Sequence, residues 1–488
     1  MPPIKIPQLR LLSEPVVLKI IDEAKDVLER VGVWIDNDEA VLLLAEHGMP
    51  TKPGKRIVKL KLEVVDRALQ TVPAHIEIFD RTGNLAMNLI EQNVHFNPGS
   101  AALHILDYDT QRPRPANSRD VQQFVHLVDA LPSYTAQSTG LIAADVPESI
   151  SDRYRLYLAL QSGKKPVVTG TFSLDGFDVM LAMLTAVRGS ATELRQKPLA
   201  IFDCCPSPPL KWSNLTCHDL MACARAGVPA ELVSMPLTGA TSPATLLGAL
   251  VQLTAENLSG IVIHQLTQPG APIIFGGSPA AFDMRNGTTP MGAIETMMID
   301  AAYAQIGQQL GLPTHAYMAL SDAKQLDTQA GFETGMGAVM AVLAGVNVIS
   351  GPGMLDFESC QSLEKLIVDN EICGEALRLK SGISARQEFF SEDLYGDIYN
   401  GEFFLTSPNT LKLFRLESYF PSSVVSRQNL QEWLAAGATT LLQRAHERVN
   451  QILAEHQPEP LPAEVQRELK QIMQTEAKKS GLSHLPTP

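Results

Sequence analysis

Polar side chains occur on short apolar runs between residues 94 and 318, and these residues are the ones best suited to chemistry. On a buried strand, the side chains covered by helices should be apolar, so a polar strand residue is expected to face the interior. The residues that this test assigns to one polar mouth are His95, Asn97, Gln137, Thr139, Thr169, Thr171, Asp203, His315 and Tyr317. A satisfied internal hydrogen bond is the alternative role for each of them.

Carboxylates near these runs are the candidates for acid, base or cation-binding roles. Asp203 ends one run, and Asp322 and Glu333 follow the run that contains His315. We take Asp203 and Glu333 as catalytic candidates, with solvated loop carboxylates as the alternative. The sequence contains no HExxH, GxSxG or phosphate-loop motif, and its histidines are scattered, so no metal site is predicted.

The apolar runs themselves predict the fold. They are Val94–Asn97, Tyr134–Thr139, Pro166–Phe172, Leu199–Cys204, Ala230–Met235, Pro272–Gly276, Pro313–Met318 and Val346–Ser350. Helical patterns separate them, and their starts lie roughly 30 to 42 residues apart, about one βα unit with its loops. Strand and helix in alternation indicate a parallel α/β sheet, and eight units favour closure into a (β/α)8 TIM barrel. A doubly wound open sheet is the alternative, although FNPGSAAL is not its usual glycine-rich loop.

The rhythm divides the chain into three parts. Residues 1–92 are expected to form an N-terminal α/β cap, with helices at 14–31, 37–47 and 61–71 and strands at 56–60 and 75–79. The barrel is expected to span 93–384. Residues 385–488 are predicted to be a mixed and then helical C-terminal extension, with helices at 426–437, 439–455 and 463–479. This extension should wrap the barrel or form a subunit contact in a homo-oligomer.

Composition limits the partners. Apolar residues make up 45% of the chain and charged residues 19%, which is a globular composition. The net charge of −14 and the lack of a basic block disfavour nucleic acid and anionic membranes. The start lacks a secretory signal and no apolar stretch is long enough to span a bilayer, so we expect a soluble, cytoplasmic protein. The six cysteines form no CxxC pair.

Several segments, in order, resemble the trimethylamine methyltransferase family. They are LLSEPVVLKIIDEAKDVLERVGV, FDMRNGTTPMGAIE, SDAKQLDTQAGFE, VLAGVNVISGPGMLDF with SLEKLIVDNEI, and FRLESYFPSSVVSRQNLQEWLAAG. The resemblance runs from about residue 10 to 455 of the sequence. It implies a TIM barrel that transfers a methyl group from a methylated amine to the Co(I) corrinoid (cobalamin) of a separate partner protein, with no tightly bound cofactor of its own.

One departure from the family bears on the substrate. Amine-specific members carry pyrrolysine in the barrel mouth, whereas the corresponding HAYMALSDAK has only ordinary residues, with Leu320 and Ser321 near that place. Trimethylamine as a free base is a poor methyl donor and needs activation. A quaternary ammonium already leaves as a neutral amine, so the protein need only position it. The resemblance therefore implies a quaternary-amine substrate, with glycine betaine as the first choice.

A trimethylammonium group is held by aromatic faces and negative charge. The aromatic candidates are Phe172, Phe275, Tyr317 and Phe357, with Asp203 or Glu333 supplying charge; core packing is the alternative for each phenylalanine. A betaine carboxylate would suit Arg285, unless that arginine pairs with Asp283. A barrel that binds a small amine without transfer, and a lyase or decarboxylase, remain alternative functions.

Overall fold

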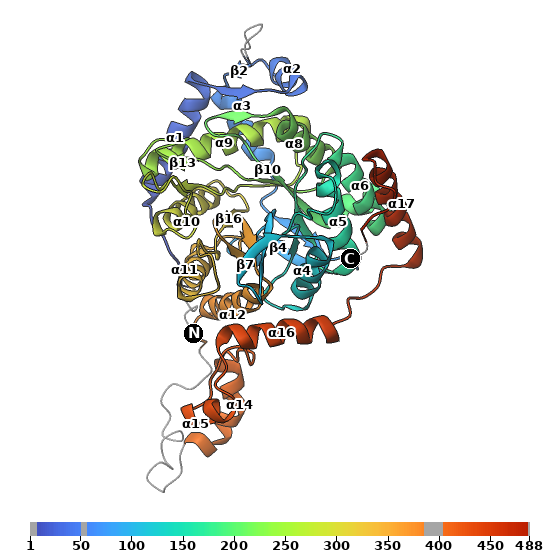
Figure 1. Ribbon diagram of the computed structural model, residues 1–488. Coiled ribbons are helices and arrows are strands. Elements are labelled where there is room, and N and C mark those ends of the chain that lie inside the picture. Colours follow the sequence, from blue (N-terminus) through green and yellow to red (C-terminus); the bar gives the residue numbers. More distant parts are fainter. Residues whose placement is uncertain (1–6, 50–55, 385–403, 487–488) are drawn as a thin grey trace.

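The computed structural model describes residues 7–49, 56–384 and 404–486, and its centre is a closed barrel of parallel strands (Figure 1). One sheet has the order β14-β12-β10-β9-β8 and another has the order β16-β17-β5. Parallel bridges from Phe96 to Tyr134 and from Phe275 to Thr314 join the two sheets at both edges. The strands are β5 (His95–Asn97), β8 (Gln137–Ser138), β9 (Val167–Thr169), β10 (Ala200–Cys204), β12 (Ala230–Leu232), β14 (Ile273–Ile274), β16 (His315–Tyr317) and β17 (Val348–Ser350). Each lies within one of the predicted runs, so the predicted TIM barrel is confirmed.

Helices surround this barrel. They are α4 (Ser118–Ala130), α5 (Ser151–Ser162), α6 (Gly176–Arg188), α7 (Ala191–Gln196), α8 (Asn214–Ala226), α9 (Leu246–Thr267), α10 (Ile294–Gln309), α11 (Thr328–Ala344) and α12 (Leu363–Lys380). Among the described helices, α9 alone is long and apolar enough to cross a bilayer, and 78% of its most apolar window is buried inside the protein. Its apolar character therefore reflects its place between α8, α10 and the N-terminal helices.

A hairpin closes the bottom of the barrel. It consists of β3 (Ile76–Phe79) and β4 (Leu85–Leu89). Its buried side chains Ile76, Ile78, Met87 and Leu89 form a cluster with strand residues Ala136, Val168, Ile201, Ile274 and Val348, apart from the core beneath the helices. These strand residues therefore face the lumen. Since side chains alternate along a strand, the lumen-facing residues two places further on lie nearer the mouth.

The other N-terminal elements pack on the outside of the barrel. They are α1 (Glu14–Arg30), β1 (Val33–Ile35), α2 (Asp38–Glu46), β2 (Ile57–Val58) and α3 (Leu62–Thr71). Helices α1, α2 and α3 contact α9, and β1 pairs with β11 (Lys211–Trp212), which follows β10. The cap boundary at residue 92 stays a prediction.

Short strands in the loops after the barrel strands cover part of the mouth. A four-stranded sheet has the order β18-β19-β6-β7, with β6 (His104–Asp107), β7 (Arg112–Pro115), β18 (Met354–Leu355) and β19 (Cys360–Gln361). It ties the loop after β5 to the loop after β17. On the other side, β13 (Leu237–Thr238) pairs with β15 (Ala280–Ala281).

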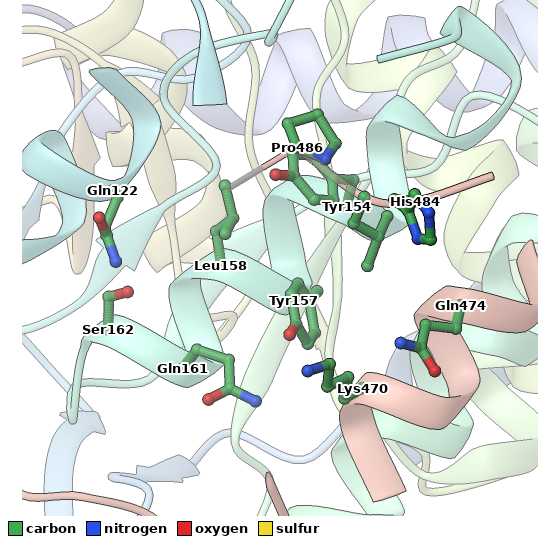
Figure 2. Close-up of a pocket in the computed structure, with 11 residues that line it drawn as sticks. Gln122, Tyr154, Tyr157, Leu158, Gln161, Ser162, Lys470, Gln474, His484 and Pro486 are labelled. Carbon is green, nitrogen blue, oxygen red and sulfur yellow. The ribbon is translucent and has the colours of Figure 1, made fainter. Parts of the chain in front are cut away.

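The described C-terminal helices lie first beyond the barrel and then along its helical shell (Figure 1). They are α14 (Pro408–Glu417), α15 (Leu430–Ala435), α16 (Leu441–Glu455) and α17 (Ala463–Lys479). Helix α16 packs on α4 and α12, and α17 packs on α5 and α6. Between α17 and α5 lies a hollow of about 480 Å³, where Tyr157 and Gln161 face Lys470 and Gln474 (Figure 2). The sequence predicted a mixed stretch at 385–415, of which residues 385–403 lie outside the described part of the chain.

Candidate active site

A cavity of about 330 Å³ lies at the carboxyl ends of the barrel strands. It is lined by Ser100, Ala101, Thr139, Arg155, Gly170, Thr171, Phe172, Asp203, Cys205, Thr216, Asp219, Val233, Met235, Ser278, Tyr317 and Glu358. These residues come from several strand ends, from the loops that follow them, and from α5 and α8. This is the position at which TIM-barrel enzymes place their active sites.

Two carboxyl groups lie at the floor of this cavity, where Asp203 lines it and the fully buried Glu231 lies beside Asp203. Asp203 on β10 pairs in register with Glu231 on β12, so both side chains point into the lumen side by side. Burial raises the pKa of Asp203 to about 7, although a hydrogen bond from Glu231 and the charge of Arg155 oppose the rise. Burial and the neighbouring Asp203 raise the pKa of Glu231 well above its ordinary value. Glu231 is therefore the member of the pair that keeps its proton to the higher pH.

A polar chain continues from this pair toward the neighbouring strands. Nε2 of His315 lies 3.2 Å from Oε1 of Glu231 and 3.1 Å from Oγ of Ser350. Asn97 donates to Ser350 through Nδ2 at 2.9 Å. Burial lowers the pKa of His315 to about 3, so the imidazole is neutral at physiological pH. These polar side chains hold the carboxyls of Asp203 and Glu231 in place. Because His315 is neutral, they add no positive charge to the floor of the cavity.

A third carboxyl reaches the cavity from a strained loop. Asp356, Phe357 and Glu358, between β18 and β19, have φ values of 50°, 55° and 68°. This left-handed region is unfavourable for residues with a Cβ, and consecutive examples are typical of functional loops. Oε1 of Glu358 is buried and has no hydrogen-bond partner among the described residues. Burial, together with the charges of Asp322 and Asp203, raises the pKa of Glu358 to about 8.

An aromatic side and a single cation complete the wall. The hydroxyl of Tyr317 lies 2.9 Å from Oγ of Ser100, and its ring meets that of His315 edge-on at 5.1 Å. Arg155, on α5, is 2% exposed and its guanidinium lies 4.5 Å from the ring centroid of Phe172. Thr171 donates to Asp219, which holds the loop after β9 against α8. Together these groups make a small polar chamber with carboxyls, one arginine and aromatic faces.

The structure brings some of the predicted site residues together. Thr139, Thr171, Phe172, Asp203 and Tyr317 line the cavity. Asn97 and His315 lie in the lumen behind it. Thr169 was predicted to face the lumen, but it pairs in register with Phe202 and points away from the lumen, because Val168 is the lumen-facing residue of β9. It is fully buried, and its hydroxyl lies 3.2 Å from that of Thr139. A contribution of these residues to substrate binding is a proposal.

Other predicted residues lie elsewhere, either because the side chain points outward or because it faces the lumen at the far end of the barrel. Gln137 points outward to α4, where Nε2 donates to the carbonyl of Val125 at 2.9 Å, because the even-numbered residues of β8 face the lumen. Phe275 packs outward against Tyr303. His95 lies at the opposite end of the barrel beside Asn88.

The proposed carboxylate ligand is also misplaced. The Arg285 side chain is 88% exposed and pairs with Asp283 at 3.0 Å, outside the cavity. Arg285 therefore pairs with Asp283, as the alternative interpretation of the sequence expected.

The remaining candidates support loops behind the mouth. Asp322 accepts hydrogen bonds from the backbone of Met291 and Gly292, both at 2.9 Å, and Glu333 accepts from Ser321 and from the backbone of Asp322. They tie the loop after β16 to the loop after β14.

Two apolar candidates lie near the same loops. Leu320 is buried, and Phe357 already faces Nζ of Lys324 at 3.7 Å. None of Leu320, Asp322, Glu333 and Phe357 lines the cavity.

Sequence reasoning missed Glu231, Glu358 and Arg155. Glu231 carries the signal used for its neighbours, a polar residue within a predicted strand run. Glu358 lies in a loop and Arg155 in a helix, where charged residues are ordinarily solvated, so only the folded arrangement reveals them.

Comparisons with known proteins identify the family and agree with the fold. A profile of the family described as trimethylamine methyltransferase (MTTB) matches residues 2–481. A trimethylamine methyltransferase MttB of Desulfitobacterium hafniense is 31% identical, over 94% of this chain and 92% of the relative. A glycine betaine methyltransferase from another strain of that species is 29% identical, over 98% and 99%. A solved monomethylamine methyltransferase (MtmB) of Methanosarcina barkeri shares the fold, with a TM-score of 0.51 at 11% identity, over 92% of this chain and 90% of that one.

Proposed function

The chain belongs to the trimethylamine methyltransferase family, and we propose that it moves a methyl group from a quaternary amine, glycine betaine or a related betaine, to the Co(I) corrinoid of a partner protein. The family makes it a methyltransferase. The observation that carries the choice of substrate is the mouth cavity, which is lined by Asp203, Glu358 and Tyr317, with Glu231 beside Asp203. Negative charge and an aromatic face are the features that hold a quaternary ammonium.

The chemistry asks little acid or base catalysis of the protein. The C–N bond breaks, its electron pair stays on nitrogen as a neutral tertiary amine, and no proton is transferred. The corrinoid, when the partner protein presents it, supplies the nucleophile that accepts the methyl group. This chain must hold the ammonium, aim one methyl group out of the mouth and exclude water. The neutral His315 and the Asp203–Glu231 pair suit holding rather than proton transfer.

The mouth has a partly apolar rim that a docking partner can cover. Phe172 and Met235 line the cavity and are 42% and 40% exposed, so they belong to both the chamber and the outer rim. An exposed apolar rim around a polar chamber is typical of a surface that a partner covers. In this proposal the partner closes the chamber when it docks.

The cellular setting and assembly are part of the same proposal. All six cysteines are free thiols, which suits a reducing, cytoplasmic compartment. A homo-oligomer is proposed from the exposed apolar side chains Ile294 and Met298 on α10 and Phe332 and Met336 on α11, which is adjacent to α10. Sedimentation of the purified chain tests the assembly.

The decisive experiment mixes the protein with a reduced corrinoid protein and one candidate amine at a time. Methylation of the cobalt changes the visible spectrum, so the rate is read directly. Glycine betaine and related betaines should give the change, and trimethylamine should not. A reaction with trimethylamine alone, or with no amine in the set, would refute the proposal.

A further inference from the structure

Arg155 is a buried cation that lines the cavity and forms no close ion pair, although the charges of Asp152 and Asp203 attract it at longer range. Its side chain is 2% exposed, and no carboxylate oxygen of the described residues lies within 4.0 Å of its nitrogens. Charged side chains are rarely buried unpaired, because the loss of hydration is not offset. Burial lowers its pKa only to about 10, so the guanidinium stays charged at neutral pH.

The surroundings hold the guanidinium in one orientation. Nη1 donates to the carbonyl of Thr139 at 2.8 Å, at the end of β8. The guanidinium lies over the Phe172 ring, and Asp152 fixes that residue by accepting its backbone N–H at 2.8 Å. Nε has no hydrogen-bond partner, and Nη2 makes none with the described residues either. The edge formed by Nε and Nη2 is the one that binds a carboxylate through two parallel hydrogen bonds.

The cavity contains both acidic and basic side chains. Asp203, Asp219 and Glu358 supply carboxyls, and Arg155 supplies the only arginine or lysine among the lining residues that the structure describes. A simple cation would be satisfied by the carboxyls and repelled by Arg155. A zwitterion that carries an ammonium and a carboxylate satisfies both.

We propose that Arg155 binds the carboxylate of a zwitterionic quaternary amine and thereby selects betaines over amines that lack a carboxylate. This inference rests on the proposed function for the ammonium half of the substrate. It assigns to Arg155 the role that the sequence had suggested for Arg285.

The test compares ligands that differ in one charge. Glycine betaine carries both charges, choline lacks the carboxylate, and 3,3-dimethylbutyrate has the same shape as glycine betaine but lacks the positive charge. Dissociation constants are measured by calorimetry for the wild type, Arg155→Gln, Arg155→Lys and the control Arg285→Gln, which removes an exposed arginine outside the cavity.

We expect Arg155→Gln to weaken the binding of glycine betaine and of 3,3-dimethylbutyrate by about 10- to 100-fold, because a bidentate charged pair is lost. Choline binding should change by less than about 3-fold, which also shows that the variant is folded. Arg155→Lys keeps the charge but not the bidentate geometry, so its dissociation constants for the two carboxylate ligands should lie between those of the wild type and Arg155→Gln. Arg285→Gln should behave as the wild type.

Two results would overturn the proposal. One is an equal loss of all three ligands in Arg155→Gln, and the other is unchanged binding of the two carboxylates. The proposed function fails separately. If carboxylate binding depends on Arg155 but no quaternary amine methylates the corrinoid protein, Arg155 remains an anion site and the methyl transfer is wrong. If choline donates methyl groups as well as glycine betaine does, the transfer stands and the selection by Arg155 is wrong.

Discussion

Glu358 should make the binding of a quaternary ammonium depend on pH. Its pKa of about 8 means that the empty cavity holds a protonated, neutral carboxyl at pH 7. A bound cation favours the ionised form, so binding must expel that proton. The affinity should therefore rise as the pH rises through 8 and level off above it.

The size of the effect follows from the ionised fraction. A carboxyl with this pKa is about 1% ionised at pH 6 and about 90% ionised at pH 9, so Kd should tighten by roughly 100-fold between them. At pH 7 the same group should release about 0.9 proton for each cation bound. Asp203, with its pKa of about 7, adds to the pH dependence of the affinity only at the lower end of this pH range.

Calorimetry in two buffers of different ionisation enthalpy measures both quantities, with tetramethylammonium as the ligand. Glu358→Gln should lose the proton release attributed to this group and give a nearly constant Kd between about pH 8 and 9. Glu46→Gln, at an exposed position on α2, is the matched control and should keep the wild-type profile. A wild-type Kd that does not change with pH, or a Glu358→Gln profile identical to the wild type, would show that Glu358 does not face the bound cation.

The same shift makes an independent prediction for stability. A carboxyl whose pKa is raised on folding binds more protons in the folded state, so stability falls as the pH rises from about 4.5 to about 8. Glu358→Gln should lose this part of the decline, and its melting temperature should exceed that of the wild type above about pH 8. Thermal melts across this range measure the difference.

Three further substitutions test the site and its support. Tyr317→Ala should weaken the binding of tetramethylammonium by about 5- to 30-fold because the aromatic face is lost, whereas Tyr317→Phe should change the affinity little. Equal effects of the two substitutions, measured by calorimetry, would contradict a cation–π role. Met87→Ala opens the fully buried plug at the barrel bottom and should lower the free energy of unfolding by about 2–5 kcal/mol in urea melts, and a loss below about 1 kcal/mol would argue against the plug. Gly351→Ala places a Cβ 2.2 Å from the Met318 carbonyl oxygen at a φ of 148°. The variant should therefore fail to fold, seen as a loss of soluble yield, or lose more than about 3 kcal/mol of unfolding free energy in chemical denaturation. Wild-type stability would contradict this.

The sequence alone determined the barrel and much of its polar mouth. The eight runs recur at the βα period because each strand must be apolar enough to lie beneath a helix, and this pattern is local. Asp203, His315 and Tyr317 were found by the same logic, since a polar residue on a buried strand has few places to point.

Side-chain direction and long-range approach were decided only by the tertiary structure. Gln137 and its neighbour Ser138 lie on opposite faces of β8, and a one-residue difference in strand phase exchanges lumen for helix contact. Glu358 reaches the cavity from a left-handed loop between β18 and β19, and Arg155 reaches it from a helix past the end of β8. No local pattern marks such residues, because their burial depends on barrel closure, which brings together segments about 200 residues apart. The sequence thus predicted where the site lies, and the fold decided which charges meet there.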